Sequence, residues 1–532
     1  MISKKIKILG LIALSFLIYS IISLFIYLRL DILIKNEFNE KFVKAAELPE
    51  LTEKQRTAEM EYIMDMLLTS FHEAMNGNEL TGIDYSERAD EYIERAAQAK
   101  SNIEYFYVID AVLSEFQSAH TDLMLPDISG YPDFLNGYIA SSDTSVYKYT
   151  DYWYDELKNT VNGYDSSLTR FNYCDGSYVS TESETDEFFT LVSVDGIPVD
   201  SYIKDNMSVW KINYDHVLKK AYRDSIVFDK NEGEKKVVLT LSDSSGKELT
   251  SDAYISFRAE LAMRYYHLIN EDNAEESDDT EEPDNYSIYC DTENDLCYIE
   301  LNSMDVSTEN TAFADEINNI PEDIGNVILD LRYNTGGVPD YVMNVVYPPL
   351  FYRSSIIESQ SVLYKSDYTD QIVDNYSGFF KLLEEKDNEI IYAETTNYFG
   401  NSETQRNVYV LTSHMTCSAA DTLSAMVKAG GAGTIIGDNT AGEGLGVYSG
   451  GYVVPLKKSG LCIKYVPFYT ENPDGTSNSL YGTAPDIYSR LNVESLEKRR
   501  MISKNCEDVY SYENRLEWDN VLADTIEIIN ND

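Results

Sequence analysis

Two segments of the chain change abruptly from β-branched apolar residues to small polar ones. Residues 327–337 and 408–421 each begin with a short apolar run typical of a buried strand and then break into glycine, serine and threonine. The apolar residues that follow the second break recur at helical spacing: Leu423, Met426 and Val427. The pattern therefore predicts a strand, a sharp turn and a helix, with Ser418 at the helix N-terminus.

Ser418 and the glycine pair are candidates for the chemistry of acyl transfer. Free N–H groups and the macrodipole at a helix N-terminus favour negative charge on a nucleophile. Serine is also a favoured helix cap, so Ser418 alone would be interpreted as a cap. Gly336 and Gly337 after the first strand lack Cβ bulk and can turn N–H groups toward an oxyanion. Together they predict a nucleophile, Ser418, and an oxyanion hole formed by the N–H groups of Gly337 and Ala419, with Gly336 permitting the turn.

Four motifs occur in an order that is specific to one family. They are Leu329-Asp-Leu-Arg-Tyr-Asn-Thr-Gly-Gly337, Thr416-Cys-Ser-Ala-Ala-Asp421, Gly437-Asp-Asn-Thr-Ala-Gly-Glu-Gly444 and Gly482-Thr-Ala-Pro-Asp-Ile487. In this order they resemble the S41 family of serine peptidases, which includes the tail-specific (C-terminal processing) proteases and the tricorn core. The resemblance implies a crotonase-like α/β core, a PDZ-like module, and peptide hydrolysis through a serine acyl-enzyme without metal or cofactor.

The catalytic base departs from the tail-specific pattern. The position that holds the lysine of that branch is occupied here by Glu443, so a Ser-Lys dyad is not expected. Residues 116–123 resemble the histidine element of the tricorn-like branch, which makes His120 the candidate general base. The orienting acid of that branch is replaced by Ser479. Either Glu443 serves as the acid, or a hydroxyl partner holds His120.

Two neighbours of Ser418 offer rival assignments. His414 lies four residues before Ser418 and is an alternative base, but in the family this segment points elsewhere. Cys417 is an alternative nucleophile, although a free cysteine usually behaves as a small buried hydrophobe.

The pattern along the chain divides it into several regions. Helical spacing precedes His120, β patterning follows it, and an acidic stretch without apolar residues separates both from the core. The expected regions are 1–34, cytoplasmic start and transmembrane helix; 45–125, helical; 126–265, β-rich and PDZ-like; 271–285, acidic linker; 286–495, peptidase core; and 496–532, C-terminal helical extension, with a helix over 515–530.

The chain start predicts a membrane anchor. Residues 8–28 are apolar and uncharged, long enough to cross a hydrocarbon core of about 30 Å, and lysines precede them. A cleaved signal peptide is the alternative, but no small-residue cleavage site follows. We expect a single-pass protein of the cell membrane with its catalytic domain on the extracellular side.

Charge and cysteine content argue against two classes of function, nucleic-acid binding and zinc binding. The chain has 91 acidic and 42 basic residues, a net charge of -49, which repels nucleic acid and anionic membrane surfaces. The 6 cysteines show no zinc spacing. Cys290 and Cys297 flank a hairpin-like segment, where either a disulfide or two thiols would fit.

The sequence thus predicts an extracytoplasmic serine endopeptidase that acts on proteins or peptides. The alternative is a catalytically degenerate protein of the same fold that binds peptides or hydrophobic ligands, because fold alone is a weak warrant for function. Oligomeric state is not indicated.

Overall fold

The computed structural model describes residues 46–116, 118, 120–124, 148–162, 168–180, 188–205, 212–265, 285–304, 308–370, 381–401, 406–446, 452–506 and 508–531. The predicted anchor at residues 8–28 and nearly all of the acidic stretch 271–285 lie outside these ranges. Within the described ranges, no helix is both long enough and apolar enough to span a membrane.

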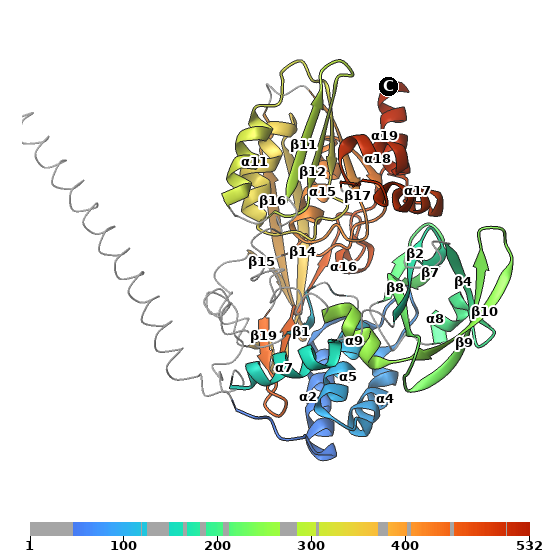
Figure 1. Cartoon of the computed structure of the whole chain (residues 1–532). Helices are drawn as coiled ribbons and strands as arrows, with labels where there is room; N and C mark the ends of the chain where they lie inside the picture. The colour runs from blue at the N-terminus through green and yellow to red at the C-terminus, as the bar shows by residue number, and fades with distance from the viewer. Residues whose placement is uncertain are drawn as a thin grey trace, which may run out of the picture.

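The centre of the core is a six-stranded sheet of order β11-β12-β13-β17-β18-β22 (Figure 1). The strands are β11 (Tyr286–Asp291), β12 (Leu296–Leu301), β13 (Asn326–Asp330), β17 (Asn407–Thr412), β18 (Thr434–Gly437) and β22 (Ile487–Tyr488). From β12 onward neighbouring strands are parallel, whereas β11 is antiparallel to β12. The inner strands are buried on both faces, which explains their unbroken apolar runs.

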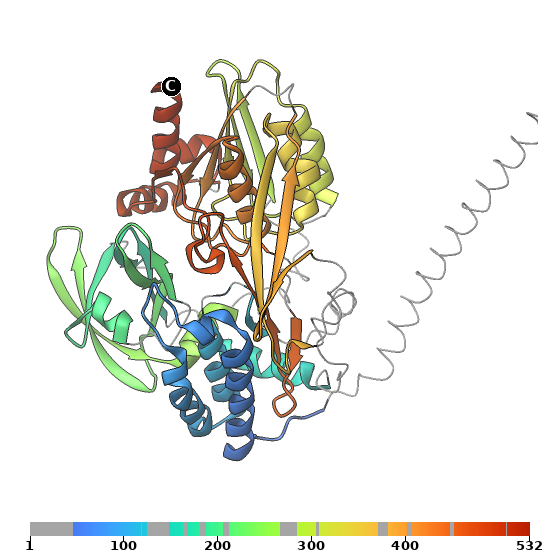
Figure 2. The same cartoon turned by 180° about the vertical axis from the view of Figure 1, so that it is seen from behind.

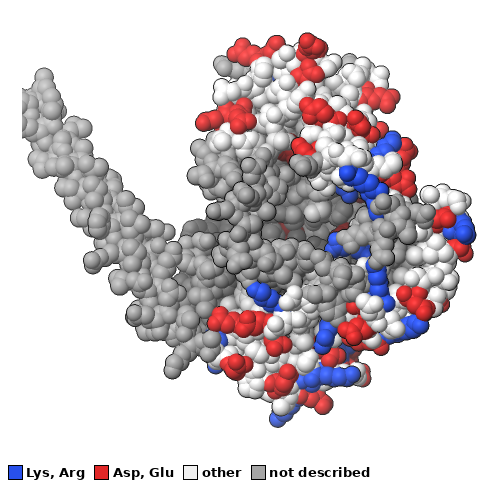
Figure 3. All heavy atoms as spheres, in the orientation of Figure 1, with Lys and Arg blue, Asp and Glu red and all other residues white. Residues whose placement is uncertain are grey.

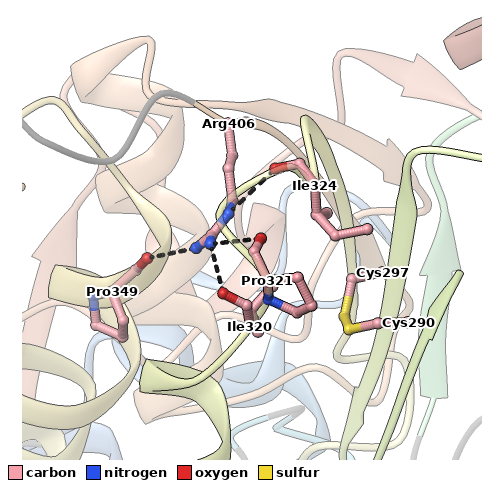
Figure 4. Close-up of a disulfide and its surroundings, with 7 residues drawn as sticks. All are labelled: Cys290, Cys297, Ile320, Pro321, Ile324, Pro349 and Arg406. Carbon is pink, nitrogen blue, oxygen red and sulfur yellow. Dashed lines mark hydrogen bonds between the residues drawn. A yellow bond between two sulfur atoms is a disulfide. The ribbon is translucent and has the colours of Figure 1, made fainter. Parts of the chain in front are cut away.

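A disulfide joins β11 to β12 through Cys290 and Cys297, which lie directly opposite each other in the antiparallel pair (Figure 4). The hairpin predicted for this segment is therefore present, with its two cysteines bonded. Nearby, the Arg406 guanidinium donates hydrogen bonds to the backbone carbonyls of Ile320, Pro321, Ile324 and Pro349. These bonds join the segments that precede β13 and β14 to β17.

Helices cover both faces of this sheet. One face packs against α11 (Thr308–Asn318), α12 (Pro339–Tyr341), η3 (Val342–Val346), α13 (Tyr347–Leu350) and α15 (Ala419–Gly430). The other face packs against α18 (Tyr512–Trp518) and α19 (Asn520–Asn531). A second sheet of order β15-β16-β14-β21 extends from the core toward the helical region (Figure 2). Its strands are β14 (Ser355–Tyr364), β15 (Lys381–Glu385), β16 (Glu389–Tyr398) and β21 (Phe468–Glu471).

The N-terminal region is helical and has its own apolar core. Its helices are α2 (Glu53–Ser70), α3 (His72–Asn76), α4 (Tyr85–Gln98), α5 (Asn102–Ser114), α7 (Thr150–Val161) and α9 (Phe257–Tyr265). Strand β1 (Asp122–Met124) follows α5 and pairs with β20 (Cys462–Tyr465), which pairs with β19 (Tyr452–Pro455). The helical region and the peptidase core therefore share a three-stranded sheet.

The β-rich region forms a module beside the core (Figure 1). Its sheet has the order β3-β2-β8-β10-β9-β4-β5, and an extra β3–β4 pairing curls it onto itself. The elements are β2 (Leu168–Cys174), β3 (Ser177–Ser180), β4 (Phe189–Val194), β5 (Ile197–Pro198), α8 (Val199–Asp205), β6 (Ile212–Asp215), β7 (Lys220–Arg223), β8 (Ser225–Asp229), β9 (Lys235–Asp243) and β10 (Glu248–Ile255). Arg490 of the core holds the module through Asp215 at 2.5 Å and Asp175 at 2.9 Å.

The C-terminal segment is helical but not a single helix over residues 515–530. After α17 (Val493–Ser503), α18 and α19 are separated at Asp519. The Asp519 carboxylate accepts hydrogen bonds from the N–H groups of Val521 and Leu522 at the start of α19, and it also binds Arg332. A buried acidic residue committed to both tasks explains the break, which apolar spacing does not reveal.

Arg332, two residues after the end of β13, is the centre of a buried ion network. Its guanidinium contacts Asp330 at 2.6 Å and Asp519 at 2.5 Å, and Tyr298 donates to Asp330 at 2.7 Å. Burial raises the pKa of Asp330, but the Arg332 charge more than offsets this and brings the pKa to about 2. Because this pKa lies below that of an unfolded aspartate, about 3.9, the stabilisation is present above that value and is lost as pH falls toward 2.

Replacement of Arg332 by alanine should destabilise the protein by about 3–5 kcal/mol, because it removes the nearest counter-charge of two buried carboxylates, Asp330 and Asp519, and leaves only the more distant Arg515, 3.7 Å from Asp519. Chemical denaturation measures the loss. Lys498→Ala removes an exposed pair with Glu494 and is the matched control, for which no measurable change is expected. Equal stability of the Arg332 variant and the control would contradict this account.

Candidate active site

Ser418 lies between β17 and α15 in a strained backbone conformation. Its φ is 54° and its ψ is -123°, a region that residues other than glycine rarely adopt. Its hydroxyl makes no cap hydrogen bond to α15, so the plain helix-cap interpretation does not describe it. Strain of about 1–3 kcal/mol at a partly exposed serine is typical of a functional site.

Gly336 lies directly against Ser418. A Cβ on Gly336 would come within 2.6 Å of the Ser418 Cβ and 3.0 Å of the Ala419 nitrogen, and the φ of Gly336 is +109°. The Gly336 carbonyl accepts a hydrogen bond from Met304 at 2.8 Å. Because C=O and N–H point in opposite directions across a trans peptide, the N–H of Gly337 points away from Met304. Only glycine fits this position.

Ala419 supplies a second N–H beside the nucleophile. It is the first residue of α15, where the backbone N–H has no partner within the helix. The Ser418 carbonyl, in the same peptide group, accepts from Thr422 N–H at 2.9 Å, so the N–H of Ala419 points out of the helix. The structure thus brings Ser418, Gly336, Gly337 and Ala419 to one place, and their roles as nucleophile and oxyanion hole stay predictions.

The buried Asp421 carboxylate ties three of the four motifs together. It accepts hydrogen bonds from Thr440 at 2.5 Å, from Thr483 at 2.7 Å, from Asn478 at 3.1 Å and from the N–H of Gly444 at 3.2 Å. These donors fix the loop that carries Gly442, whose carbonyl accepts from Ser418 N–H at 3.0 Å. Sequence reasoning missed this role, although an acidic residue in an otherwise apolar helical turn was a visible signal.

His120 reaches the core from the helical region. Ser118 accepts hydrogen bonds from the N–H groups of His120 at 3.2 Å and Thr121 at 3.0 Å, and it donates to Glu443 at 2.9 Å. Two residues later, β1 pairs with β20. The structure thus brings His120 and Glu443 into one cluster through Ser118, and Glu443 directly follows the Gly442 that binds Ser418.

Lys464 is the member of this cluster that sequence reasoning missed. Its Nζ lies 3.2 Å from Nδ1 of His120. It lies on β20 opposite Asp122, so strand register places it beside His120. A single charge in the apolar run 461–466 was the only sequence signal.

The carboxyl groups of Glu443 and Glu73 are buried and interact electrostatically. Glu443 is 7% exposed and has a φ of 61°. Glu73 of α3 lies nearby, and burial together with the charge of Glu443 raises the pKa of Glu73 to about 8. Glu73 is therefore protonated at neutral pH, which limits the negative charge around Glu443.

Other predicted candidates lie elsewhere. Ser479, on α16 (Asn478–Tyr481), lines a small cavity of about 50 Å³ together with His216 and His414. His414 pairs with Asp224 of the β module at 3.0 Å. Cys417 is 7% exposed, and its N–H donates to the carbonyl of Asn334 at 3.1 Å. Among the described residues, no group of histidine, cysteine and acidic side chains could hold a metal ion.

Comparison with known proteins identifies the domain. Residues 295–489 match the model of Peptidase family S41. No curated protein matches the chain significantly. The fold is similar to that of mature CPAF complexed with lactacystin, at 12% identity over 90% of this chain and 99% of that chain, with a TM-score of 0.50. The family predicted from the four motifs is confirmed, while the use of a histidine base stays a prediction.

Two further solved structures are similar at lower scores. The photosystem II D1 C-terminal processing protease is 13% identical over 82% of this chain and 93% of that chain, with a TM-score of 0.33. The tricorn protease is 14% identical over 90% of this chain and 37% of that chain, with a TM-score of 0.34.

Gly336→Ala should reduce the rate of fluorophosphonate labelling by at least about 100-fold, the loss expected when an oxyanion donor is displaced. The added methyl would press on Ser418 and Ala419. Gly246→Ala is the matched control, because its φ is +80° and nothing lies within 4 Å of the added atom. The control should keep wild-type labelling, and equal labelling by both variants would show that the glycine contact is not needed.

Proposed function

We propose that this protein, a serine-type peptidase whose residues 295–489 belong to Peptidase family S41, is a membrane-anchored endopeptidase that cleaves proteins or peptides outside the cytoplasm. The observation that carries the proposal is the contact of Gly336 with Ser418, which sets two outward N–H groups beside a strained serine. This is the arrangement that receives the oxyanion of acyl transfer.

The proposed reaction proceeds through an acyl-enzyme. His120 takes the proton of Ser418 as Oγ attacks the substrate carbonyl, and the oxyanion accepts hydrogen bonds from the N–H groups of Gly337 and Ala419. His120 then gives this proton to the leaving amine. Water, deprotonated in the same way, hydrolyses the ester and restores Ser418.

The proposed location rests on three features. The apolar segment 8–28 with its preceding lysines has the composition of a signal anchor. The Cys290–Cys297 disulfide favours an oxidising compartment. The net charge of -49 keeps an exported domain soluble, and acidic side chains are spread over both the core and the helical region on the face in Figure 3.

The β module is proposed to hold extended substrate segments as a PDZ-like domain. Its short terminal strand β5 and the adjacent helix α8 leave a sheet edge to which a peptide could add by backbone hydrogen bonds. The Arg490 contacts to Asp215 and Asp175 keep this module against the core.

A binding protein without catalysis is the second candidate. One observation favours it: Nδ1 of His120 faces the amine of Lys464, where a Ser-His-acid triad has a carboxylate. A binding protein of this fold would need no group that accepts the imidazole proton of His120.

Cleavage of an unfolded protein substrate, followed by mass spectrometry of the products, tests the proposed function. We expect Ser418→Ala to abolish cleavage and His120→Ala to lower kcat/KM at least about a thousandfold. Ser424→Ala is the matched control, because it removes a hydroxyl from the helix that follows Ser418, one that donates to the Ala420 carbonyl at 2.9 Å. Wild-type protein that is folded but inert would establish the binding alternative.

A further inference from the structure

We propose that Lys464 is a positioning residue that decides which nitrogen of His120 carries the proton, and that the site works as a relay from Ser418 through His120 to Lys464. The inference rests on the proposed peptidase function and adds a member to its machinery. In this proposal, the amine of Lys464 occupies the position that the orienting carboxylate holds in a Ser-His-acid triad.

Strand pairing fixes Lys464 beside His120. Asp122 and Lys464 are partners in the antiparallel β1–β20 pair, and His120 precedes Asp122 by two residues. The neighbours of Lys464 on β20, Ile463 and Tyr465, are buried in the core of the helical region. Because side chains alternate along a strand, Lys464 points to the opposite side, toward His120.

Lys464 also faces the loop elements around the nucleophile. Burial lowers the pKa of its ammonium, while Asp122, Glu443 and Cys417 act in the opposite direction. The carboxylate of Asp122 also forms an ion pair with the Arg264 guanidinium at 2.7 Å, which weakens its electrostatic attraction for Lys464. The amine is thus surrounded by groups from β1, from the loop after β18 and from the turn before α15.

The charged and neutral forms of Lys464 impose different tautomers on His120. An ammonium has three donors and no acceptor, so it can bond only an unprotonated Nδ1. A neutral His120 in that state carries its proton on Nε2 and cannot accept one there. A neutral amine accepts from Nδ1–H instead, which leaves the Nε2 lone pair ready for the serine proton.

The proton balance of the relay is complete without another reactant. Ser418 Oγ–H gives its proton to Nε2 of His120, and the Nδ1 proton moves to the Lys464 amine, which becomes an ammonium. When the tetrahedral intermediate collapses, the C–N bond breaks, the leaving amine takes a proton from Nε2, and Lys464 returns one to Nδ1. Charge is moved away from the nucleophile and then restored.

The relay predicts that activity rises with pH. Full-length protein should be labelled with a fluorophosphonate between about pH 6 and pH 10, with Ser418→Ala as the blank, and the rate should climb by about tenfold per pH unit until Lys464 loses its proton. A wild-type profile that levels off in the ordinary histidine range would overturn the relay.

Substitutions of Lys464 give the sharper test. Lys464→Glu supplies a carboxylate that accepts from Nδ1–H, so labelling near pH 7 should rise at least about tenfold and the alkaline rise should disappear. Lys464→Gln, whose amide oxygen also accepts, should flatten the profile in the same way, which keeps the test valid if the glutamate variant does not fold. Lys457→Glu, in the exposed turn of the same hairpin, is the charge control and should behave as wild type.

The outcomes separate the relay from the peptidase itself. Ser418-dependent labelling that ignores every Lys464 substitution would reject the relay and leave the proposed function standing. Loss of labelling in Lys464→Met but not in His120→Phe would reject the relay in favour of direct attack by the lysine on the Ser418 proton. No labelling in any folded variant at any pH would reject both.

Discussion

The buried carboxylate of Asp421 is the constraint on which the site depends. A parallel sheet leaves its catalytic loops at strand ends, where nothing in the sheet itself fixes one loop against another. Asp421 supplies this restraint through four neutral donors, which include Thr440 and Thr483 from two separate motifs. No cation is among these contacts, and burial of the Asp421 carboxylate is tolerated only because both of its oxygens accept hydrogen bonds. The loop fixed in this way places the Gly442 carbonyl where it accepts a hydrogen bond from the Ser418 N–H. It also places Glu443 beside Ser118 of the helical region.

The two halves of the site come from distant parts of the chain. The core contributes Ser418 and the glycine turn, and the N-terminal helical region contributes His120. The β1–β20 pair joins them, and the same pair delivers Lys464 to the histidine. Small displacements of the helical region relative to the core would therefore act on base and amine together. Glu73, whose pKa is raised to about 8 by burial and by the charge of Glu443, adds no second negative charge beside Glu443 at neutral pH.

Local patterns predicted the elements of the site better than its connections. The strand–turn–helix around Ser418 and the glycine turn follow from apolar spacing and from the absence of Cβ, both of which are local. The break at Asp519 and the roles of Asp421 and Lys464 each involve a distant partner, 187, 62 and 344 residues away in the chain, respectively, and no periodicity encodes such contacts. The same limit applies to the orienting partner of His120, for which spacing offered only Glu443 or a hydroxyl. Long-range strand pairing put an amine there.

The most direct test of the account is the location of the covalent adduct that a fluorophosphonate forms with wild-type protein. Cleavage at Arg406 and Lys428 releases a peptide that contains three serines, Ser413, Ser418 and Ser424, and fragmentation distinguishes them. The account predicts a single adduct on Ser418, because only this hydroxyl is unused by its helix and flanked by two outward N–H groups. An adduct on another residue, or none on folded protein across the alkaline range, would contradict it.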